Sequence, residues 1–464
     1  TRLMADSPRA VYAKVRTRSG EEGLLYDASV DPEFGRSLLS TIEKRRKFRD
    51  NGHEVSGVRT SFYRHAMADL DEPPAPTPSR AEQSNTSILY PDRFILKLYR
   101  RASPGVNPDL EIGRYLTDKK GFRNASRIAG ALEHQGPGEE PRTLGVLQEY
   151  IPNEGDGWRH ALDAISSYFE RIQSLDDSDE SAEIRPPAQP LARLVATERP
   201  QQAADLIGPY LGYAELLGKR TAEMHLALAA PTEDESFAPE PFTSLYRRSL
   251  YQSMRNLTGR AFRLLRRRLK SLPPEIGELA KTLLSSEGDI MERYRSPLES
   301  AADAQRTRIH GDYHLGQVLF TGRDFVIIDF EGEPARSLTE RRLKRSPLRD
   351  IAGMLRSFDY AAQTGLRSHR ERYGLTPDDP HLRRLISSAG FWRRWTEQAF
   401  LAEYLRVADD PDFLPDGDAL FLMLEVYLLE KATYELAYEL NNRPDWVEIP
   451  LRGILEILDR DAAA

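Results

Sequence analysis

Residues 310–334 read HGDYHLGQVLFTGRDFVIIDFEGEP and place acidic and amide side chains around one short apolar run. Asp312 is followed five positions later by Gln317, and a turn at TGRD then separates two strand-like segments that lead to Asp329. In kinases, one aspartate accepts the proton of the substrate hydroxyl, while an amide and a second aspartate bind metal ions. The spacing therefore predicts Asp312 as the catalytic base and Gln317 and Asp329 as Mg²⁺ ligands. The alternative is a polar turn between two strands that contains its aspartates by chance.

Two positions of this stretch depart from the pattern of protein kinases. Gln317 stands where those enzymes have Asn, which keeps the side-chain oxygen on an arm one methylene longer. Glu331 stands where they have the Gly of the DFG motif, so its carboxylate is expected to join the metal ligands or to face the acceptor. His314, two residues after Asp312, is also expected to face the acceptor.

A kinase also needs a lysine on a strand of its small lobe, held by a glutamate on the following helix. Residues 84–101, SNTSILYPDRFILKLYRR, read as strand, turn and strand, with Lys97 near the centre of the second strand. A helix is predicted to begin at Asn107 and to carry Glu111 in its first turn, which makes Glu111 the expected partner of Lys97. The alternative is that Lys97 simply points outward from an alternating strand.

The nucleotide would need further contacts from the same region. No glycine-rich loop precedes the strand of Lys97, so backbone amides and hydroxyl groups at the start of the preceding strand are expected to cover the phosphates. The residues concerned are Ser84, Asn85 and Thr86. Residues 142–153, RTLGVLQEYIPN, read as a strand that runs into a hinge. By position alone, backbone groups around Glu149 and Ile151 are expected to bind the adenine edge of ATP.

The composition indicates a globular protein of two or three domains. The chain has 464 residues, of which 40% are hydrophobic, a net charge of −7 and no cysteine. The negative charge argues against general binding of nucleic acid, and no apolar stretch approaches the length of a membrane span. We therefore expect a cytoplasmic protein without nucleic-acid or membrane partners. The basic stretch 255–272 is expected to be a solvated helix face, and His225 to be structural.

The fold class expected from these patterns is α+β, namely a bilobal protein-kinase-like fold. A small β-rich lobe carries an extra N-terminal cap subdomain, and a large, mainly helical lobe carries the catalytic loop and the sugar site. The predicted regions are 1–75 for the cap, 80–155 for the β-rich lobe and 156–464 for the helical lobe. Within them we expect a helix over 34–48, a proline-rich linker or exposed loop at 71–80 and a mobile surface loop at 176–190.

Several stretches together resemble bacterial maltokinases, which have the aminoglycoside-phosphotransferase-like, eukaryotic-type kinase fold. They are HGDYHLGQVL, IIDFEGEP, KRSPLRDIAGMLRSFDYAA, SNTSILYPDRFILKLYRR and NPDLEIGRYL. The resemblance implies phosphorylation of maltose at its anomeric hydroxyl by ATP and Mg²⁺, giving maltose 1-phosphate for α-glucan (glycogen) synthesis. In some bacteria this kinase follows a trehalose synthase domain, so such a domain or subunit is a candidate partner. The Thr at the start of the chain fits such a fusion.

The resemblance repeats the roles already given to Asp312, Gln317, Asp329 and Lys97, and it adds supporting residues. It implies that Asp350, in SPLRDIAG, braces the catalytic loop by accepting backbone N–H groups. An N-cap of the helix IAGMLRSF is the local alternative for Asp350. His310 is expected to support the loop as a structural residue.

The acceptor sugar is expected to bind on a helix within residues 424–446, because a disaccharide needs aromatic faces and polar groups. Lys431, Tyr434, Glu435 and Tyr438 follow one another at i, i+3, i+4 and i+7, which places them on one face. The resemblance puts sugar contacts at Lys431, Tyr434 and Tyr438. The alternative is a core helix with packed tyrosines and salt pairs between successive turns.

The function predicted from the sequence is therefore that of a maltokinase. One alternative is a kinase of the same fold that acts on another sugar, an aminosugar or an aminoglycoside. A second alternative, from another class, is a non-catalytic kinase-like scaffold domain of a fused enzyme. The presence of Asp312, Asp329 and Lys97 argues against the scaffold.

Overall fold

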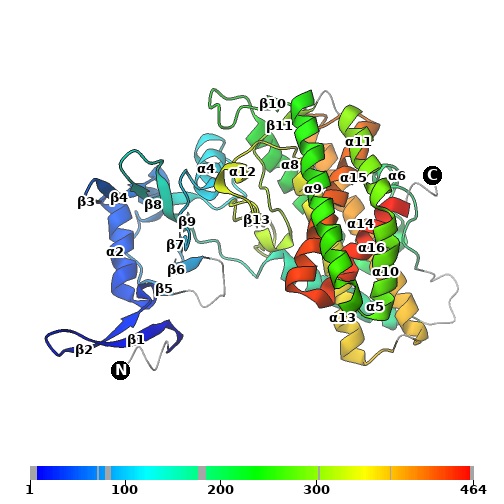
Figure 1. Ribbon diagram of the computed structural model, residues 1–464, viewed down its shortest axis with the longest axis horizontal. Coiled ribbons are helices and arrows are strands. Elements are labelled where there is room, and N and C mark those ends of the chain that lie inside the picture. Colours follow the sequence, from blue (N-terminus) through cyan, green and yellow to red (C-terminus); the bar gives the residue numbers. More distant parts are fainter. Residues whose placement is uncertain are drawn as a thin grey trace. The chain divides into compact units, whose positions relative to one another are not determined.

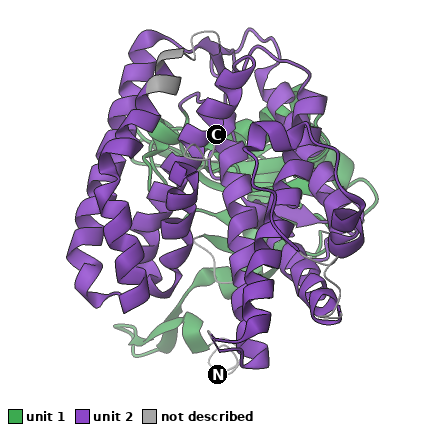
Figure 2. Cartoon of the chain, turned by 90° about the vertical axis from the view of Figure 1, so that its right-hand side faces the viewer, with its two compact units in different colours: residues 1–152, 326–342 green, residues 153–325, 343–464 purple. Residues whose placement is uncertain are grey.

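The computed structural model describes residues 8–70, 73–78, 85–175, 184–300, 304–376 and 378–459. The chain divides into two compact units, coloured separately in Figure 2. Unit 1 consists of Thr1–Pro152 and Val326–Arg342, and unit 2 consists of Asn153–Phe325 and Leu343–Ala464. Unit 1 thus combines the N-terminal part of the chain with a short segment from much later in the sequence.

Unit 1 is built on an antiparallel sheet in the order β3-β4-β8-β9-β7-β6-β5 (Figure 1). The strands are β3 Lys47–Asp50, β4 His53–Arg59, β5 Thr77–Pro78, β6 Thr86–Tyr90, β7 Phe94–Leu98, β8 Ile128–Gln135 and β9 Arg142–Glu149. A separate hairpin is formed by β1 Val11–Arg16 and β2 Glu22–Tyr26. The strand, turn and strand expected within 84–101, and the strand expected from Arg142, are confirmed. Lys97 pairs with Ser87 on β6 and with Val146 on β9, which places it in the interior of the sheet.

Helix α2 (Pro32–Glu43) approaches the sheet closely because two residues on the strands beneath it have no side chain. A Cβ atom at Gly57 would lie 2.1 Å from the backbone oxygen of Thr41, and one at Gly130 would lie 2.4 Å from the side chain of Ile42. Ile42 is fully buried in the core of the unit. The helix predicted over 34–48 is confirmed in its first part.

The end of that helix and the proline-rich stretch after it differ from the prediction. The helix stops at Glu43, because Arg45 takes a positive φ of 50° and β3 follows. The stretch expected to be a linker or an exposed loop contributes β5, which is Thr77–Pro78. This strand lies at the edge of the sheet, where a proline is tolerated because no further strand needs its N–H.

The remaining helices of unit 1 are α3 Ser61–Ala66, α4 Pro108–Arg114, a π-helical turn at Tyr115–Lys119 and α12 Leu338–Arg341. Helix α4 begins where the sequence predicts it. The Asn107 side chain accepts a hydrogen bond from the backbone N–H of Asp109, and Pro108 occupies the first helical position. This start determines where the acidic side chains of the first turn point.

Unit 2 is mainly helical, as the sequence predicts from residue 157 onward (Figure 1). Its helices are α5 Gly157–Gln173, α6 Leu191–Val195, α7 Gln201–Ile207, α8 Tyr210–Ala229, α9 Ser244–Arg268, α10 Pro274–Ser285, α11 Glu287–Ser300, α13 Leu348–Tyr373, α14 Pro380–Ala408, α15 Asp418–Asn442 and α16 Glu448–Asp459. Helix α13 packs against α5, α14 and α15. Short strands β10 Glu240–Pro241 and β11 Gln305–Arg306 pair with each other, and β12 Val318–Phe320 precedes β13 Phe325–Ile327.

Two surface expectations concern unit 2. The basic stretch 255–272 lies mostly in α9, where Arg255, Arg260 and Arg263 are exposed, so the solvated helix face is confirmed. The insert at 176–190 is only partly described, from Ile184 onward. Ile184 is buried and its backbone oxygen accepts a hydrogen bond from Ser387, whereas Arg185, Pro186 and Ala188 are exposed. The mobility of this loop stays a prediction. No helix in the described part of the chain combines the length and the hydropathy that a membrane span requires.

Candidate active site

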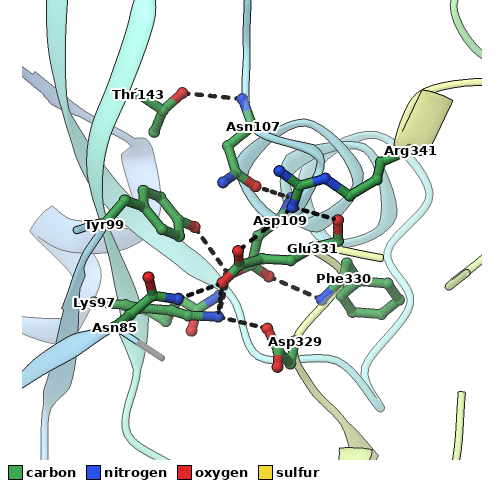
Figure 3. A network of polar contacts seen from close by, with 11 residues as sticks. Asn85, Lys97, Tyr99, Asn107, Asp109, Thr143, Asp329, Phe330, Glu331 and Arg341 are labelled. Carbon is green, nitrogen blue, oxygen red and sulfur yellow. Dashed lines mark hydrogen bonds and ion pairs between the residues drawn. The ribbon is translucent and has the colours of Figure 1, made fainter. Parts of the chain in front are cut away.

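Lys97 extends from β7 into a group of three carboxylates within unit 1 (Figure 3). Its Nζ lies 2.5 Å from Oδ1 of Asp329 and 3.6 Å from Oδ2 of Asp109, and it also contacts Oε1 of Glu331. The side chain of Lys97 is 14% exposed, and that of Asp109 is fully buried. The structure therefore brings together the lysine and the acidic pair that the sequence singled out, and it adds Asp109.

The charges of this cluster govern the protonation of its members. Burial alone would lower the pKa of Lys97, but the carboxylates of Asp109, Asp329 and Glu331 outweigh burial and raise its pKa above the ordinary value. Burial raises the pKa of Glu331, and Lys97 opposes that shift. Lys97 consequently remains an ammonium ion. One ammonium beside three carboxylates leaves a surplus of negative charge, which favours an additional cation.

The backbone at Asp329 directs the acidic pair toward Lys97. Asp329 has a φ of 65°, in the left-handed region that residues with a side chain seldom occupy. The next residue, Phe330, donates its backbone N–H to Oδ1 of Asp109 at 3.1 Å. Strained conformations of this kind persist only where surrounding contacts hold them, and they are frequent at functional sites.

Glu331 is held from two further directions. Nδ2 of Asn85 donates to its Oε1 at 2.7 Å, and Nη1 of Arg341 lies 3.7 Å from its Oε2. Arg341 also donates to the backbone oxygen of Glu331 at 3.1 Å. Figure 3 shows both partners reaching Glu331 beside Lys97. Glu331 lies close to Lys97 in unit 1, and its role toward the metal or the acceptor stays a prediction.

The donor set of this cluster fits Mg²⁺. Asp329 and Glu331 each offer a partly exposed carboxylate oxygen, and one oxygen of the fully buried Asp109 lies within 4.8 Å of both. Carboxylate oxygens are hard ligands, which Mg²⁺ prefers. The other expected ligand, Gln317, lies in unit 2, in the turn Leu315–Gln317, where its backbone N–H donates to the carbonyl of His314 at 2.8 Å. Its role as a ligand stays a prediction.

Glu111 requires a correction. It was expected to hold Lys97, but the structure pairs it with Arg342, whose Nη2 lies 2.8 Å from Oε1 of Glu111. The helix carboxylate within ion-pair distance of Lys97 is Asp109. The reason is helical geometry, because residues two apart differ by about 200° around the axis and point to opposite sides.

The expected nucleotide contacts have different outcomes. Ser84 lies outside the described residues, and Asn85 is engaged with Glu331. The hydroxyl of Thr86 accepts a hydrogen bond from Arg100 at 3.3 Å. Their roles in covering phosphates stay predictions.

The expected hinge begins at the end of β9. The backbone N–H of Glu149 donates to Arg127, and its carbonyl accepts a hydrogen bond from Ser126. The Glu149 side chain forms an ion pair with Arg127 at 2.6 Å. The backbone groups of Glu149 are thus engaged within unit 1, and the roles of Glu149 and Ile151 toward adenine stay predictions.

In unit 2, Asp350 holds the backbone of the catalytic loop. Its Oδ2 accepts the N–H of His310 at 2.8 Å, and its Oδ1 accepts that of Gly311 at 2.9 Å. Nε2 of His225 lies 3.1 Å from the same carboxylate, and Nδ1 of His225 lies 2.9 Å from the hydroxyl of Tyr404. The bracing role of Asp350 and the structural role of His225 are therefore confirmed.

The protonation of Asp350 follows from this environment. Burial would raise its pKa, but the hydrogen bond and charge of His225, together with the charge of His310 and the N–H of Gly311, lower it. The N-cap alternative is wrong, because α13 already begins at Leu348, and Asp350 lies inside its first turn. His310 supports the same loop, since its Nδ1 accepts the N–H of Asp312 at 3.4 Å.

Asp312 lies beside helix α15. Nζ of Lys431 is 3.6 Å from Oδ1 of Asp312, and both side chains are about a quarter exposed, at 26% and 22%. His314, expected to face the acceptor, instead accepts the backbone N–H of Gly316 through Nδ1 at 3.1 Å. It therefore shapes the turn that follows Asp312, and its contact with an acceptor stays a prediction.

Three of the four side chains expected to contact the sugar are neighbours on α15, and their contact with a sugar stays a prediction. Nζ of Lys431 lies 5.3 Å from the ring centre of Tyr434, and the ring of Tyr434 stacks on that of Tyr438 at 6.5 Å. Tyr438 is 45% exposed, so this part of the helix is no packed core. Glu435 is the exception, because its carboxylate is paired with Arg356 at 2.8 Å. Burial raises the pKa of Glu435, and Arg356 opposes that shift.

Comparison with known proteins identifies the family. The model of the phosphotransferase enzyme family, APH, matches residues 77–386, which is more than half of the chain. The chain belongs to this phosphotransferase family. The match includes β7, α4, the catalytic loop and the segment of Asp329, whereas helix α15 lies beyond its end.

Relatives of this phosphotransferase include two curated glucosamine kinases. The protein from Streptacidiphilus jiangxiensis is 22% identical over 81% of this chain and 72% of its own length. The protein from Mycolicibacterium smegmatis (strain ATCC 700084 / mc(2)155) is 23% identical over 82% of this chain and 79% of its own length. A solved glucosamine kinase, in complex with glucosamine, ADP and inorganic phosphate, superposes with a TM-score of 0.62 at 21% identity, covering 96% of this chain and 87% of that chain. The expected kinase-like α+β fold is thereby confirmed.

Asp109 is the site residue of this phosphotransferase that sequence reasoning missed. Its position in an Asn-Pro-Asp helix start suggested only a role in that start. The available signal was helical spacing, since a residue two positions from Glu111 faces the opposite way. Arg341 was missed as well, because no local pattern links it to Glu331.

Proposed function

We propose that this phosphotransferase transfers the γ-phosphoryl group of ATP to the anomeric hydroxyl of maltose. The observation that carries the proposal is the pairing of Asp312 with Lys431 on the aromatic face of α15. Asp312 would accept the proton of the attacking hydroxyl, and Tyr434 and Tyr438 would stack on sugar rings. A disaccharide has two sugar rings, and Tyr434 and Tyr438 offer one aromatic surface for each of them. The presence of two aromatic side chains therefore supports a disaccharide as the acceptor.

The nucleotide is assigned to unit 1. Lys97 would bind the phosphates, and Asp329 and Glu331 would hold Mg²⁺ with ATP. The bound Mg²⁺ would supply neutralisation of the charge on the phosphoryl group. The chain's own contribution is the surplus carboxylate charge beside Lys97, which orients the ammonium and leaves acidic groups for a cation.

Glucosamine is the second candidate acceptor, because the curated relatives described above are glucosamine kinases. The charges near Asp312 speak for a neutral sugar instead. Lys431 is a cation beside Asp312, and the nearest expected carboxylate on the same helix face, Glu435, is already paired with Arg356. The ammonium group of glucosamine would be repelled by the ammonium of Lys431. The carboxylate of Glu435 would not offset this repulsion, because it is already paired with Arg356.

The experiment is a coupled ADP-release assay with Mg·ATP and maltose, glucose, trehalose, glucosamine or kanamycin. We expect the highest kcat/KM with maltose and no acceptor-dependent turnover in Asp312→Asn. A higher kcat/KM with glucosamine would replace maltose by the second candidate. Tight Mg·ATP binding without turnover of any sugar would leave the scaffold alternative in place. The expected association with a trehalose synthase domain stays a proposal, testable by co-purification.

A further inference from the structure

We infer that Asp109, and not Glu111, is the helix carboxylate that positions Lys97 for the nucleotide phosphates. The inference rests on the proposed function, because it gives Lys97 the role of binding ATP. It replaces the usual lysine–glutamate arrangement of kinases by one in which an aspartate from the first turn of α4 does this work. Four contacts within unit 1 support it.

The contacts of Asp109 converge from separate parts of unit 1 (Figure 3). Oδ2 of Asp109 lies 3.6 Å from Nζ of Lys97 and accepts hydrogen bonds from the hydroxyl of Tyr99 and from Nε2 of Gln148, each at 3.2 Å. Its Oδ1 accepts the backbone N–H of Phe330 at 3.1 Å. One carboxylate therefore joins β7, β9 and the turn between Asp329 and Glu331.

Burial distinguishes Asp109 from the other two carboxylates around Lys97. The side chains of Asp329 and Glu331 are 34% and 17% exposed, whereas that of Asp109 is 0% exposed. Asp329 and Glu331 are the carboxylates assigned to the metal. Once they turn toward a cation, the buried Asp109 remains as the counter-charge of Lys97, because its hydrogen bonds keep it in place.

Glu111 is directed elsewhere. It forms a two-bond ion pair with Arg342, with distances of 2.8 Å and 3.2 Å. Its partner lies directly after α12, in the segment that returns to unit 1 late in the chain. Glu111 thus fastens α12 to α4, while Asp109 acts on the opposite side of the same helix turn.

The decisive comparison uses Asp109→Asn, Asp109→Ala and Glu111→Gln. Asparagine removes the charge but keeps an oxygen that accepts the N–H of Phe330, whereas alanine removes both. We expect Asp109→Asn to raise both the Kd of Mg·AMP-PNP and the KM for ATP by about tenfold. A tenfold change is the size expected when Lys97 loses a charge interaction that shifts its pKa by about one unit. The KM for the sugar is expected to stay within about twofold, because the acceptor is assigned to unit 2.

A second readout separates positioning from folding. Amide hydrogen exchange at Phe330 is expected to stay slow in Asp109→Asn and to become faster in Asp109→Ala. Glu111→Gln is expected to change the Kd of Mg·AMP-PNP by no more than about twofold, since it removes only a partly exposed ion pair.

The inference is overturned if Glu111→Gln weakens nucleotide binding as much as Asp109→Asn, or if Asp109→Asn binds Mg·AMP-PNP like the wild type. An equal rise in the KM for ATP and for the sugar would also overturn it, as this would indicate general damage. Binding of Mg·AMP-PNP requires no acceptor. Failure of every sugar in the ADP-release assay would therefore count against the proposed function and leave this test intact.

Discussion

The ammonium of Lys431 lies 3.6 Å from the carboxylate of Asp312, and this pair joins helix α15 to the catalytic loop within unit 2. We expect Lys431→Met to lower kcat by about tenfold or more and to raise the KM for the sugar, because the cation orients Asp312 and borders the acceptor. The KM for ATP is expected to change little. Steady-state kinetics with each substrate varied in turn will measure this split. A selective rise in the KM for ATP would contradict the assignment of Lys431 to the acceptor.

Asp350 is predicted to be essential for the stability of the catalytic loop. Replacing it by alanine leaves the N–H groups of His310 and Gly311 and the ring of His225 without their buried acceptor. We expect the free energy of unfolding to fall by about 3 kcal/mol, and turnover to fall with it. Asp350→Asn, which keeps an acceptor oxygen, should lose less stability. Urea unfolding followed by circular dichroism will compare the two variants, and equal losses would argue that the charge alone matters.

The close packing of α8 against α14 gives a matched pair of glycine substitutions. A Cβ at Gly218 would lie 2.2 Å from the backbone oxygen of Phe400, whereas one at Gly212 on the same helix meets nothing within 4 Å. We expect Gly218→Ala to destabilise by about 2 kcal/mol or more, because two backbones must separate. Gly212→Ala should be neutral or stabilise by about 0.5 kcal/mol. A thermal midpoint of Gly218→Ala equal to that of the wild type would contradict the packing.

His369 is predicted to make the stability of unit 2 sensitive to mild acid. It is buried against the rings of Phe169 and Tyr373, and this burial lowers its pKa. The charge of Arg372 lowers the pKa further, whereas the charge of Glu170 raises it. Since the unfolded chain binds the proton more tightly, the stabilising contribution is complete above about pH 6.5 and is lost as the pH falls toward the folded pKa.

The test compares thermal midpoints between pH 7.5 and pH 5.5. We expect the midpoint of His369→Phe to fall less than that of the wild type, because phenylalanine keeps the packing and cannot be protonated. His381→Gln, at an exposed position at the start of α14, is the control and should retain the wild-type slope. Identical slopes for the wild type and His369→Phe would refute the prediction.

The parts of the fold that follow local rules could be predicted from the sequence. Alternation and the turn at residues 91–93 indicate β6 and β7, and Asn107 with Pro108 marks the start of α4. The helix of Asp350 was recognised, although its first residue was placed three positions late. These features depend on residues within one or two turns of one another.

The features that were missed depend on contacts between distant residues. Glu435 falls on the expected face of α15, but its partner Arg356 lies on α13, and helical periodicity carries no information about it. In the same way, Asp109 meets Phe330 only after the chain has returned to unit 1. The expected pairing of Lys97 with Glu111 was wrong because it followed the order of elements and not the direction in which each side chain points.

The return of Val326–Arg342 to unit 1 has a consequence for synthesis on the ribosome. Lys97 and Asp109 emerge early, whereas Asp329 and Glu331 follow only after Asn153–Phe325 has been translated. Domains usually fold in the order in which they are made, but this unit must wait for residues made after a large part of its neighbour. A nascent chain released before Asp329 would hold the lysine without its acidic pair, so such truncated products cannot complete the cluster that surrounds Lys97.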